Sequence, residues 1–200
     1  MYKSLYGLYM VLKWGSTTVT AIKWGSTTCT AVYWGSTKVF PSDAVASLTS
    51  AWCGVQANVN GSWKYGLSNA TSFKFPTSGT NVIGSVSGKS LSSSNYSGGN
   101  TTANGEAGLV TNAKIACTGT VTLTVNVTAK GGAVYLLYGS NLPTAKSYPS
   151  TTSWSSGYTI KCNGNPSATG TFTQTASISG SYYLWVCAQS CSFTVTSLTY

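Results

Sequence analysis

One tetrapeptide occurs three times near the N-terminus, as Trp14-Gly15-Ser16-Thr17, Trp24-Gly25-Ser26-Thr27 and Trp34-Gly35-Ser36-Thr37. The segments between the copies are rich in Thr and contain Val, Ile and Tyr, all of which favour strands. A short fixed period indicates a repeated structural unit, and such units rarely bury a core by themselves. The repeats therefore favour a protein that assembles with other chains over one that catalyses a reaction.

The composition predicts an all-β protein of one or two domains. The chain has 200 residues, of which 42% are hydrophobic and only 6% are charged. Thr, Val and Tyr favour strands, whereas the abundant Gly, Ser and Asn favour turns. The apolar content is sufficient for a hydrophobic core, and hydroxyl and amide groups must supply most of the solubility.

Residues 1–40 form the first predicted region, a repetitive attachment and assembly element. Each Gly-Ser pair fits a two-residue hairpin turn with Gly first. Strands of about eight residues between such turns would give an antiparallel β-meander. A repeat wound around a threefold axis, a β-prism, is the alternative. A region of this size needs staples or partner chains in order to fold, so both arrangements predict oligomers.

Residues 41–105 form a predicted β-rich transition. We expect one helical turn after Ser42, which would cap it, and short strands with turns at Asn60-Gly61 and Ser78-Gly79. The low-complexity stretch from about 87 to 105 is rich in Ser and Gly and predicts a flexible loop.

Residues 106–200 are predicted to form a β-sandwich of the jelly-roll type. Apolar and polar residues alternate over 121–128, as in a half-buried strand, while 133–138 is apolar throughout. Further strands are expected at 170–178, 182–187 and 193–200, with turns at Ser179-Gly180 and Gln189-Ser190. Regular short strands with Gly-rich turns are typical of sandwiches.

The inventory of reactive side chains argues against an enzyme. The chain has no His, and its only acidic residues are Asp43 and Glu106. A glycosidase needs two placed carboxyl groups, and these two are expected in a linker and at the edge of a loop. We therefore expect no catalytic residue and no cofactor.

Neither metal nor nucleic acid is an expected partner. Cys187 and Cys191 are four residues apart, but a zinc site without His would need further thiolates or a carboxylate. Buried free thiols are the simpler expectation for the six cysteines. The net charge is +9, but the lysines are spread evenly and do not form the basic stripe of a nucleic-acid binder. The apolar residues 1–13 are too few to span a membrane, so no membrane insertion is expected.

Three aromatic residues are candidates for glycan binding. Tyr148, Trp154 and Tyr158 lie among Ser, Thr and Asn in the segment 139–158. Aromatic rings stack on sugars while polar neighbours bind the hydroxyl groups. The alternative is that these rings cover the core beneath a long loop.

The repeats resemble those of known virion proteins. Lys13-Trp14-Gly15-Ser16-Thr17-Thr18-Val19 and its two later copies are similar to tandem units in appendage proteins from tailed phages of gut Bacteroidales, including crAss-like phages. The resemblance covers about the first forty residues. It implies that the N-terminal region attaches to the particle and that the C-terminal β-domain faces outward.

The resemblance implies a structural protein of the virion, a surface fibre or decoration protein made in the host cytoplasm. Its implied partners are two further copies of itself in a homotrimer, together with capsid or tail proteins. Trp supplies rigid contact area, so the expected attachment residues are Trp14, Gly15, Trp24, Gly25, Trp34 and Gly35. The small size favours a head fibre. A tail-attached adhesin that recognises host surface glycans is the alternative.

Overall fold

The computed structural model describes the backbone of residues 13–14, 17–18, 23–24, 27–28, 32–34, 37–40, 48–75, 82–150 and 158–200. The chain divides into two compact units, Met1–Val45 and Ala46–Tyr200. All regular elements in the described residues are β-strands, which confirms the all-β prediction. The same residues include no helix with the length and apolar character that a membrane crossing requires.

The first unit contains three short antiparallel hairpins. Their strands are β1 (Lys13–Trp14), β2 (Thr17–Thr18), β3 (Lys23–Trp24), β4 (Thr27–Thr28), β5 (Val32–Trp34) and β6 (Thr37–Phe40). Each repeat Trp is paired with the Thr three residues later, so two residues separate the strands, as the Gly-Ser turns predict. Each hairpin forms its own two-stranded sheet in the described residues.

The second unit is built from thirteen strands that pair in one continuous antiparallel sheet. They are β7 (Leu48–Val59), β8 (Ser62–Ser68), β9 (Ser72–Lys74), β10 (Val82–Ser87), β11 (Ser90–Ser93), β12 (Asn95–Gly98), β13 (Thr101–Thr111), β14 (Ile115–Ala129), β15 (Ala133–Gly139), β16 (Lys146–Ser150), β17 (Thr159–Gly164), β18 (Gly170–Gln189) and β19 (Ser192–Thr199).

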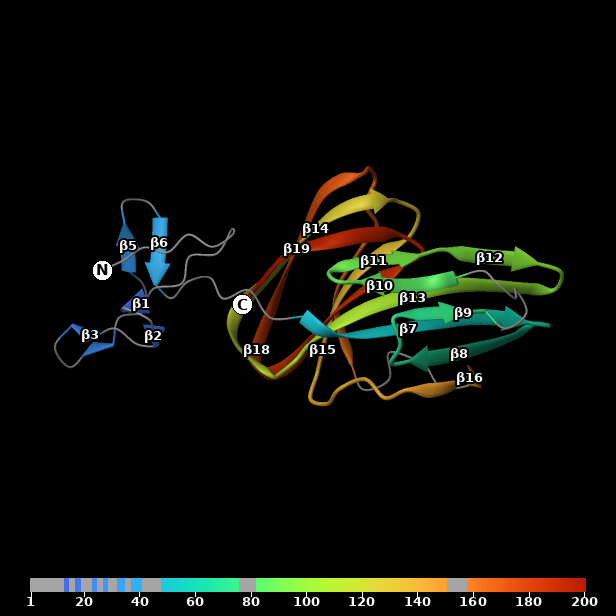
Figure 1. Ribbon diagram of the computed structural model, residues 1–200, viewed down its shortest axis with the longest axis horizontal. Coiled ribbons are helices and arrows are strands. Elements are labelled where there is room, and N and C mark those ends of the chain that lie inside the picture. Colours follow the sequence, from blue (N-terminus) through green and yellow to red (C-terminus); the bar gives the residue numbers. More distant parts are fainter. Residues whose placement is uncertain are drawn as a thin grey trace. The chain divides into compact units, whose positions relative to one another are not determined.

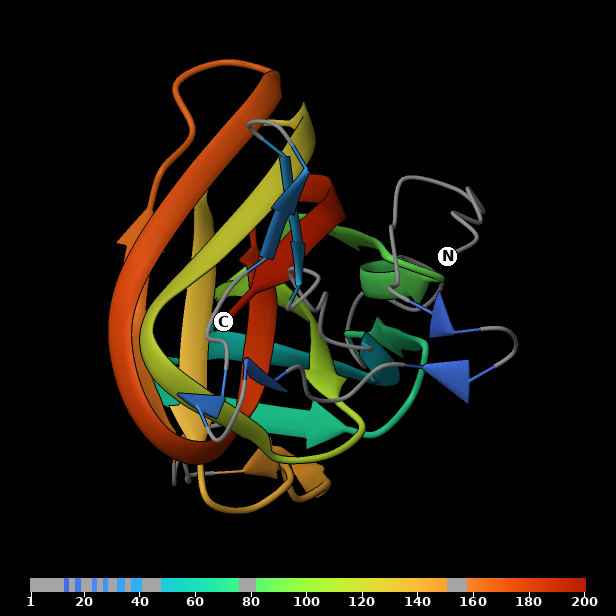
Figure 2. The same cartoon turned by 90° about the vertical axis from the view of Figure 1, so that its left-hand side faces the viewer.

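The long strand β18 joins the two halves of this sheet (Figure 1). Its first part pairs with β14, and its last part lies between β13 and β15. Figure 2 shows β18 as a long curved strand with β14 beside it. From this shared strand, one half continues through β14, β19, β11, β10 and β9, and the other through β13, β7, β8 and β16.

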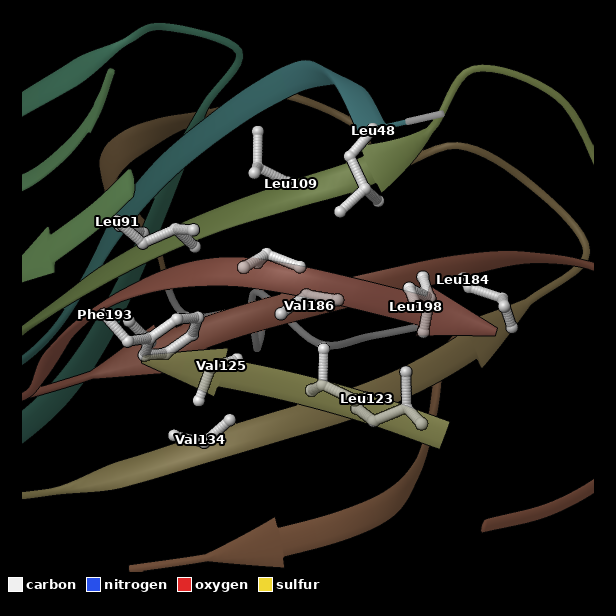
Figure 3. Packing of buried hydrophobic residues seen from close by; sticks show 14 of the residues in the cluster. Leu48, Leu91, Leu109, Leu123, Val125, Val134, Leu184, Val186, Phe193 and Leu198 are labelled. Carbon is white, nitrogen blue, oxygen red and sulfur yellow. The ribbon is translucent and has the colours of Figure 1, made fainter. Parts of the chain in front are cut away.

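The main hydrophobic core collects side chains from both halves of the sheet. Leu123 and Val125 of β14 contribute from one half, and Leu109 of β13 and Val186 of β18 from the other (Figure 3). Phe193 of β19 joins the same cluster. The alternation predicted for 121–128 is confirmed, because the odd-numbered positions are buried and the even-numbered ones face outward or are only half-buried.

A second cluster lies beneath the ends of β7 and β13. Val55, Ala57 and Ala103 pack there with Phe75 and Ile83. The β10 backbone approaches β13 so closely that a Cβ on Gly105 would overlap the carbonyl of Ile83. The glycine is required at this position by the close approach of two backbones.

The prediction of a flexible loop over 87–105 was wrong. The segment forms β11, β12 and the first half of β13. Leu91 is buried and anchors β11, while Ser90 and Ser92 form hydroxyl hydrogen bonds to Thr194 and Ser192, at 2.8 and 3.0 Å. A polar composition resembles that of a loop, but it also suits strands whose hydroxyl groups bond across to the next strand.

The prediction of a turn at Ser179-Gly180 was also wrong, because β18 continues through both residues. Gly180 has a φ of 120° and lies where β18 passes from one half of the sheet to the other. The turn after Gln189 is confirmed, with Ser190 at a φ of 52°.

The predicted turn at Asn60-Gly61 is confirmed, with φ values of 51° and 80° that suit a type I′ hairpin. The helical turn after Ser42 and the turn at Ser78-Gly79 lie outside the described residues. The predicted boundary between 105 and 106 falls within β13, so residues from 48 onward share one sheet with the C-terminal strands.

Candidate functional site

A buried carboxyl group lies on the sheet face that points away from the main core. Glu106 is in the middle of β13 and only 2% exposed, so its predicted place at a loop edge was wrong. It pairs directly with Gln189 of β18, and the Gln189 Nε2 donates a hydrogen bond of 2.6 Å to Glu106 Oε1. Cys187 Sγ lies 3.4 Å from the other carboxyl oxygen and donates to it.

A chain of polar side chains continues from Glu106 across the same face. The Tyr135 hydroxyl on β15 donates to Gln189 Oε1 at 2.7 Å, and Gln56 Nε2 on β7 donates to the Tyr65 hydroxyl on β8 at 3.1 Å. A longer contact of 3.5 Å from Gln189 Nε2 to Gln56 Oε1 joins the two pairs. Five strands thus contribute to one hydrogen-bonded network, whose outer members are half-buried.

The electrostatics of this network depend on the burial of Glu106. Burial raises the pKa of Glu106 from 4.5 to about 8, while the hydrogen bonds from Gln189 and Cys187 act in the opposite direction. Among the described residues no cation forms an ion pair with Glu106. The carboxyl group is therefore mainly protonated at neutral pH, because a buried charge without a counter-ion is costly.

Aromatic rings occupy the rest of this face. Trp52 and Trp185 are buried beside Leu67, Val110 and Leu137, and half-buried tyrosines pack against them. The Trp185 ring lies over Gly108, where a Cβ would overlap its indole nitrogen. The face therefore combines flat rings with amide and phenol groups.

Of the three predicted glycan-binding residues, the structure places one in this cluster. The ring of Tyr158 packs edge-on against Trp185, with 4.9 Å between centroids and a 71° interplanar angle. Its hydroxyl donates to the carbonyl of Asn141, and burial raises the Tyr158 pKa. Tyr148 lies within β16, but its side chain, like Trp154, falls outside the described residues. The contact with Trp185 fits the alternative in which Tyr158 covers the core.

The predicted attachment residues are placed only by their backbone. Trp14, Trp24 and Trp34 belong to β1, β3 and β5, each at the same position of its hairpin. Gly15, Gly25 and Gly35 lie outside the described residues. The three repeats thus have equivalent local pairing.

The cysteines form no disulfide within the described part of the chain. Cys53, Cys117, Cys187 and Cys191 are buried and Cys162 is half-buried, all as free thiols. No group of three or more potential metal ligands occurs in the described residues. Burial raises the pKa of each of these five thiols, and a protonated thiol is a poor nucleophile and a poor metal ligand.

This arrangement is suited to binding through hydrogen bonds and ring contacts. Glu106 is the only acidic side chain among the described residues, since Asp43 lies outside them, so the structure brings no pair of carboxyl groups together. Sequence reasoning missed Gln56, Tyr135 and Gln189 as members of the site. Their common face becomes visible only once the strand register is known, because the three residues come from distant parts of the chain.

No protein-family model and no curated protein matches this chain.

Proposed function

We propose that the protein is a structural component of a phage virion, a surface fibre or decoration protein attached through its N-terminal repeats. The observation that carries this proposal is the set of three hairpins with equivalent pairing, in a compact unit separate from the larger β-unit. The N-terminal repeats are the sequence feature that resembles virion appendage proteins. Within this class of protein, a head fibre is the form that we propose.

The hairpins favour an assembly role because each one is small. Two paired strands of two to four residues have marginal stability in water. Packing against other copies supplies the missing contacts, and Trp at each equivalent position gives rigid contact area at low entropic cost. A homotrimer with the repeats as a β-meander or β-prism, docked on a capsid or tail protein, satisfies this requirement.

The larger unit suits an outward position because it has its own cores. Among the residues whose burial is described, three buried clusters form within Ala46–Tyr200. In this proposal the unit is a sandwich of the jelly-roll type that projects from the particle, and it carries no catalytic step. The protein is then located in the virion after synthesis in the bacterial cytoplasm.

The test is the molar mass in solution by light scattering. Full-length protein is compared with residues 46–200 and with a full-length variant that has Ala at Trp14, Trp24 and Trp34. A trimer for the full chain and monomers for both variants support the proposal. A full-length monomer, or a trimer that persists without the repeats, contradicts it. Leu142→Ala is the matched control, since it removes an exposed apolar side chain from the larger unit.

A second candidate function is adhesion to host surface glycans by a tail-attached protein. The observation that favours it is the gathering of half-buried tyrosines, including Tyr158, beside amide groups on one sheet face. The candidate residues remain Tyr148, Trp154 and Tyr158. Binding to a glycan array that is lost in Trp154→Ala, at unchanged melting temperature, supports this function. Binding that survives the substitution excludes Trp154.

A further inference from the structure

The most exposed large aromatic side chain of the described residues is Trp63, with 50% of its surface in solvent. It is the second residue of β8, directly after the type I′ turn at Asn60-Gly61. Tryptophan is highly buried on average, so a Trp side chain with half of its surface in solvent is unusual. The surroundings of Trp63 show what kind of contact the surface is suited to make.

A row of polar residues extends from Trp63 across three further strands. Trp63 pairs with Asn58 on β7, Asn58 pairs with Thr102 on β13, and Thr102 pairs with Ser97 on β12. Residues directly opposite in antiparallel strands point to the same face of the sheet. Thr102 and Ser97 are exposed and Asn58 is half-buried, so the row lies at the surface.

The next row toward the centre of the sheet has the same chemistry. Tyr65 pairs with Gln56, and Gln56 pairs with Asn104. All three are half-buried. The hydrogen bond from Gln56 to the Tyr65 hydroxyl and the contact from Gln189 to Gln56 fix the orientation of these side chains.

Buried side chains on the opposite face support this surface. The opposite face of the same strands packs Val55, Ala57 and Ala103 into the cluster with Phe75. At the tips, the backbone amide of Asn60 donates to the carbonyl of Asn100 at 3.2 Å, which ties the β7–β8 turn to the β12–β13 turn. Figure 1 shows both turns at the same end of the sheet.

We propose that these two rows form a binding surface for an uncharged polysaccharide. An aromatic ring packs against the C–H face of a sugar, while amides and hydroxyls bond to its hydroxyl groups. None of the residues in the two rows is charged, so the surface has no cation that would form an ion pair with an acidic polymer. Trp63 and Tyr65 are two residues apart on one strand, about 7 Å, which lets two sugars of one extended chain contact two rings.

This site deepens the second proposed function and rests on it, but it uses residues other than Tyr148, Trp154 and Tyr158. Residues of both rows belong to strands of the larger unit, whereas the attachment proposal concerns the repeats. Loss of sugar binding and loss of trimer formation are therefore separate results. A second copy of the chain is the competing occupant of the surface.

The test uses full-length protein and soluble polysaccharides in affinity electrophoresis and titration calorimetry. The probes are a mixed-linkage β-glucan, an α-mannan, a galactomannan and, as the acidic control, polygalacturonate. We expect at least one neutral polymer to bind and polygalacturonate not to bind. Trp63→Ala should weaken the affinity at least tenfold, and Asn58→Ala severalfold. Trp63→Tyr should keep part of the binding because it retains a ring.

Tyr200→Ala is the matched control, since Tyr200 is an exposed aromatic residue that follows β19 in the other half of the sheet. It should bind as the unchanged protein does, and melting temperatures show whether each variant is folded. Three results overturn the proposal: no neutral polymer binds, binding is unchanged by Trp63→Ala and Asn58→Ala, or Trp63→Ala changes only the molar mass. The last result would assign the surface to a contact between copies.

Discussion

Glu106 and Gln189 pair across β13 and β18, and the amide nitrogen of Gln189 donates a hydrogen bond of 2.6 Å to the buried carboxyl group, shorter than the 3.4 Å contact from Cys187. The amide can donate to the carboxyl group in either protonation state, but it brings no positive charge. The carboxyl group therefore titrates without a counter-ion in a site from which water is excluded.

The burial of Glu106 predicts a stability that falls as the pH rises, because burial raises the pKa of the carboxyl group more than the hydrogen bond from Gln189 lowers it. The pKa of Glu106 is about 8 in the folded chain, whereas the unfolded chain has the ordinary value of 4.5. Between these two pH values the carboxyl group is therefore more ionised in the unfolded chain than in the folded one. The contribution of the protonated Glu106 carboxyl group to the free energy of unfolding is complete below about pH 4.5 and is lost as the pH rises to about 8. We expect the melting temperature of the unchanged protein to fall across this range and that of Glu106→Gln to vary much less.

The control for this experiment is Asp43→Asn, which removes the only other acidic side chain and should leave the pH profile in place. If the melting temperature of Glu106→Gln fell with pH as that of the unchanged protein does, this would contradict the assignment of the pH dependence to Glu106. Cys187, Cys191 and Tyr135 face the same site and also have raised pKa values. The comparison is therefore restricted to pH values below about 7.5, where these groups are mostly protonated in both the folded and the unfolded chain.

The close contacts around Gly105 predict that one added methyl group lowers the stability strongly. A Cβ at this position would overlap the backbone carbonyls of Ile83 and Ser94, which no rotamer change can move. We expect Gly105→Ala to lower the free energy of unfolding by at least about 1–3 kcal/mol, the usual cost of overpacking. Urea denaturation measures this loss. Thr118→Ala, at an exposed position of β14, should change the stability far less, and equal losses would argue against the close approach of β10.

The main core predicts a large effect at Leu123 and a small one at Leu142. Leu123 is 1% exposed in the cluster between the two halves of the sheet, whereas Leu142 is 45% exposed. Leu123→Ala should lower the free energy of unfolding by about 2–5 kcal/mol because it leaves a cavity. Leu142→Ala should stay within about 0.5 kcal/mol of the unchanged protein. Similar losses in the two variants would contradict the packing in Figure 3.

The thiols should differ in their reactivity in the native state. Burial raises the pKa of Cys53 to about 12 and that of Cys191 to about 11, whereas Cys162 is only half-buried. Because the thiolate is the reactive form, Cys162 should be the first of the five described thiols to react with an alkylating reagent. Cys53 and Cys187 should react only on unfolding. Peptide mapping by mass spectrometry after timed alkylation measures the order. Modification of Cys53 as fast as Cys162 would contradict it.

Local sequence patterns predicted those elements that depend only on neighbouring residues. The alternation around Leu123 and the Asn60-Gly61 turn are present as expected, because side-chain period and backbone preference are properties of neighbouring residues. The pairing of Trp14 with Thr17 across a two-residue turn was also predictable from neighbouring residues.

The candidate site was not predictable in this way. Glu106 was expected at a loop edge because Ser and Gly residues precede it, yet it is buried by strands that lie far from it in the sequence. The strand over 90–93 has few apolar residues and is stabilised by cross-strand hydroxyl pairs with β19, about one hundred residues away. Such pairing depends on the register of distant segments, which composition does not contain.

The shared strand β18 also has a consequence for folding during synthesis. β14 pairs with β18 and β19, and both follow it in the chain. A ribosome that has just produced β14 must add about forty further residues before the first partner begins at Gly170. Until then, the alternating apolar face around Leu123 lacks its β-strand neighbours. The growing chain is therefore prone to aggregation during this period, and the pairing of strands so far apart in the sequence is slow. Chaperones that shield extended apolar segments would therefore increase the yield of folded protein.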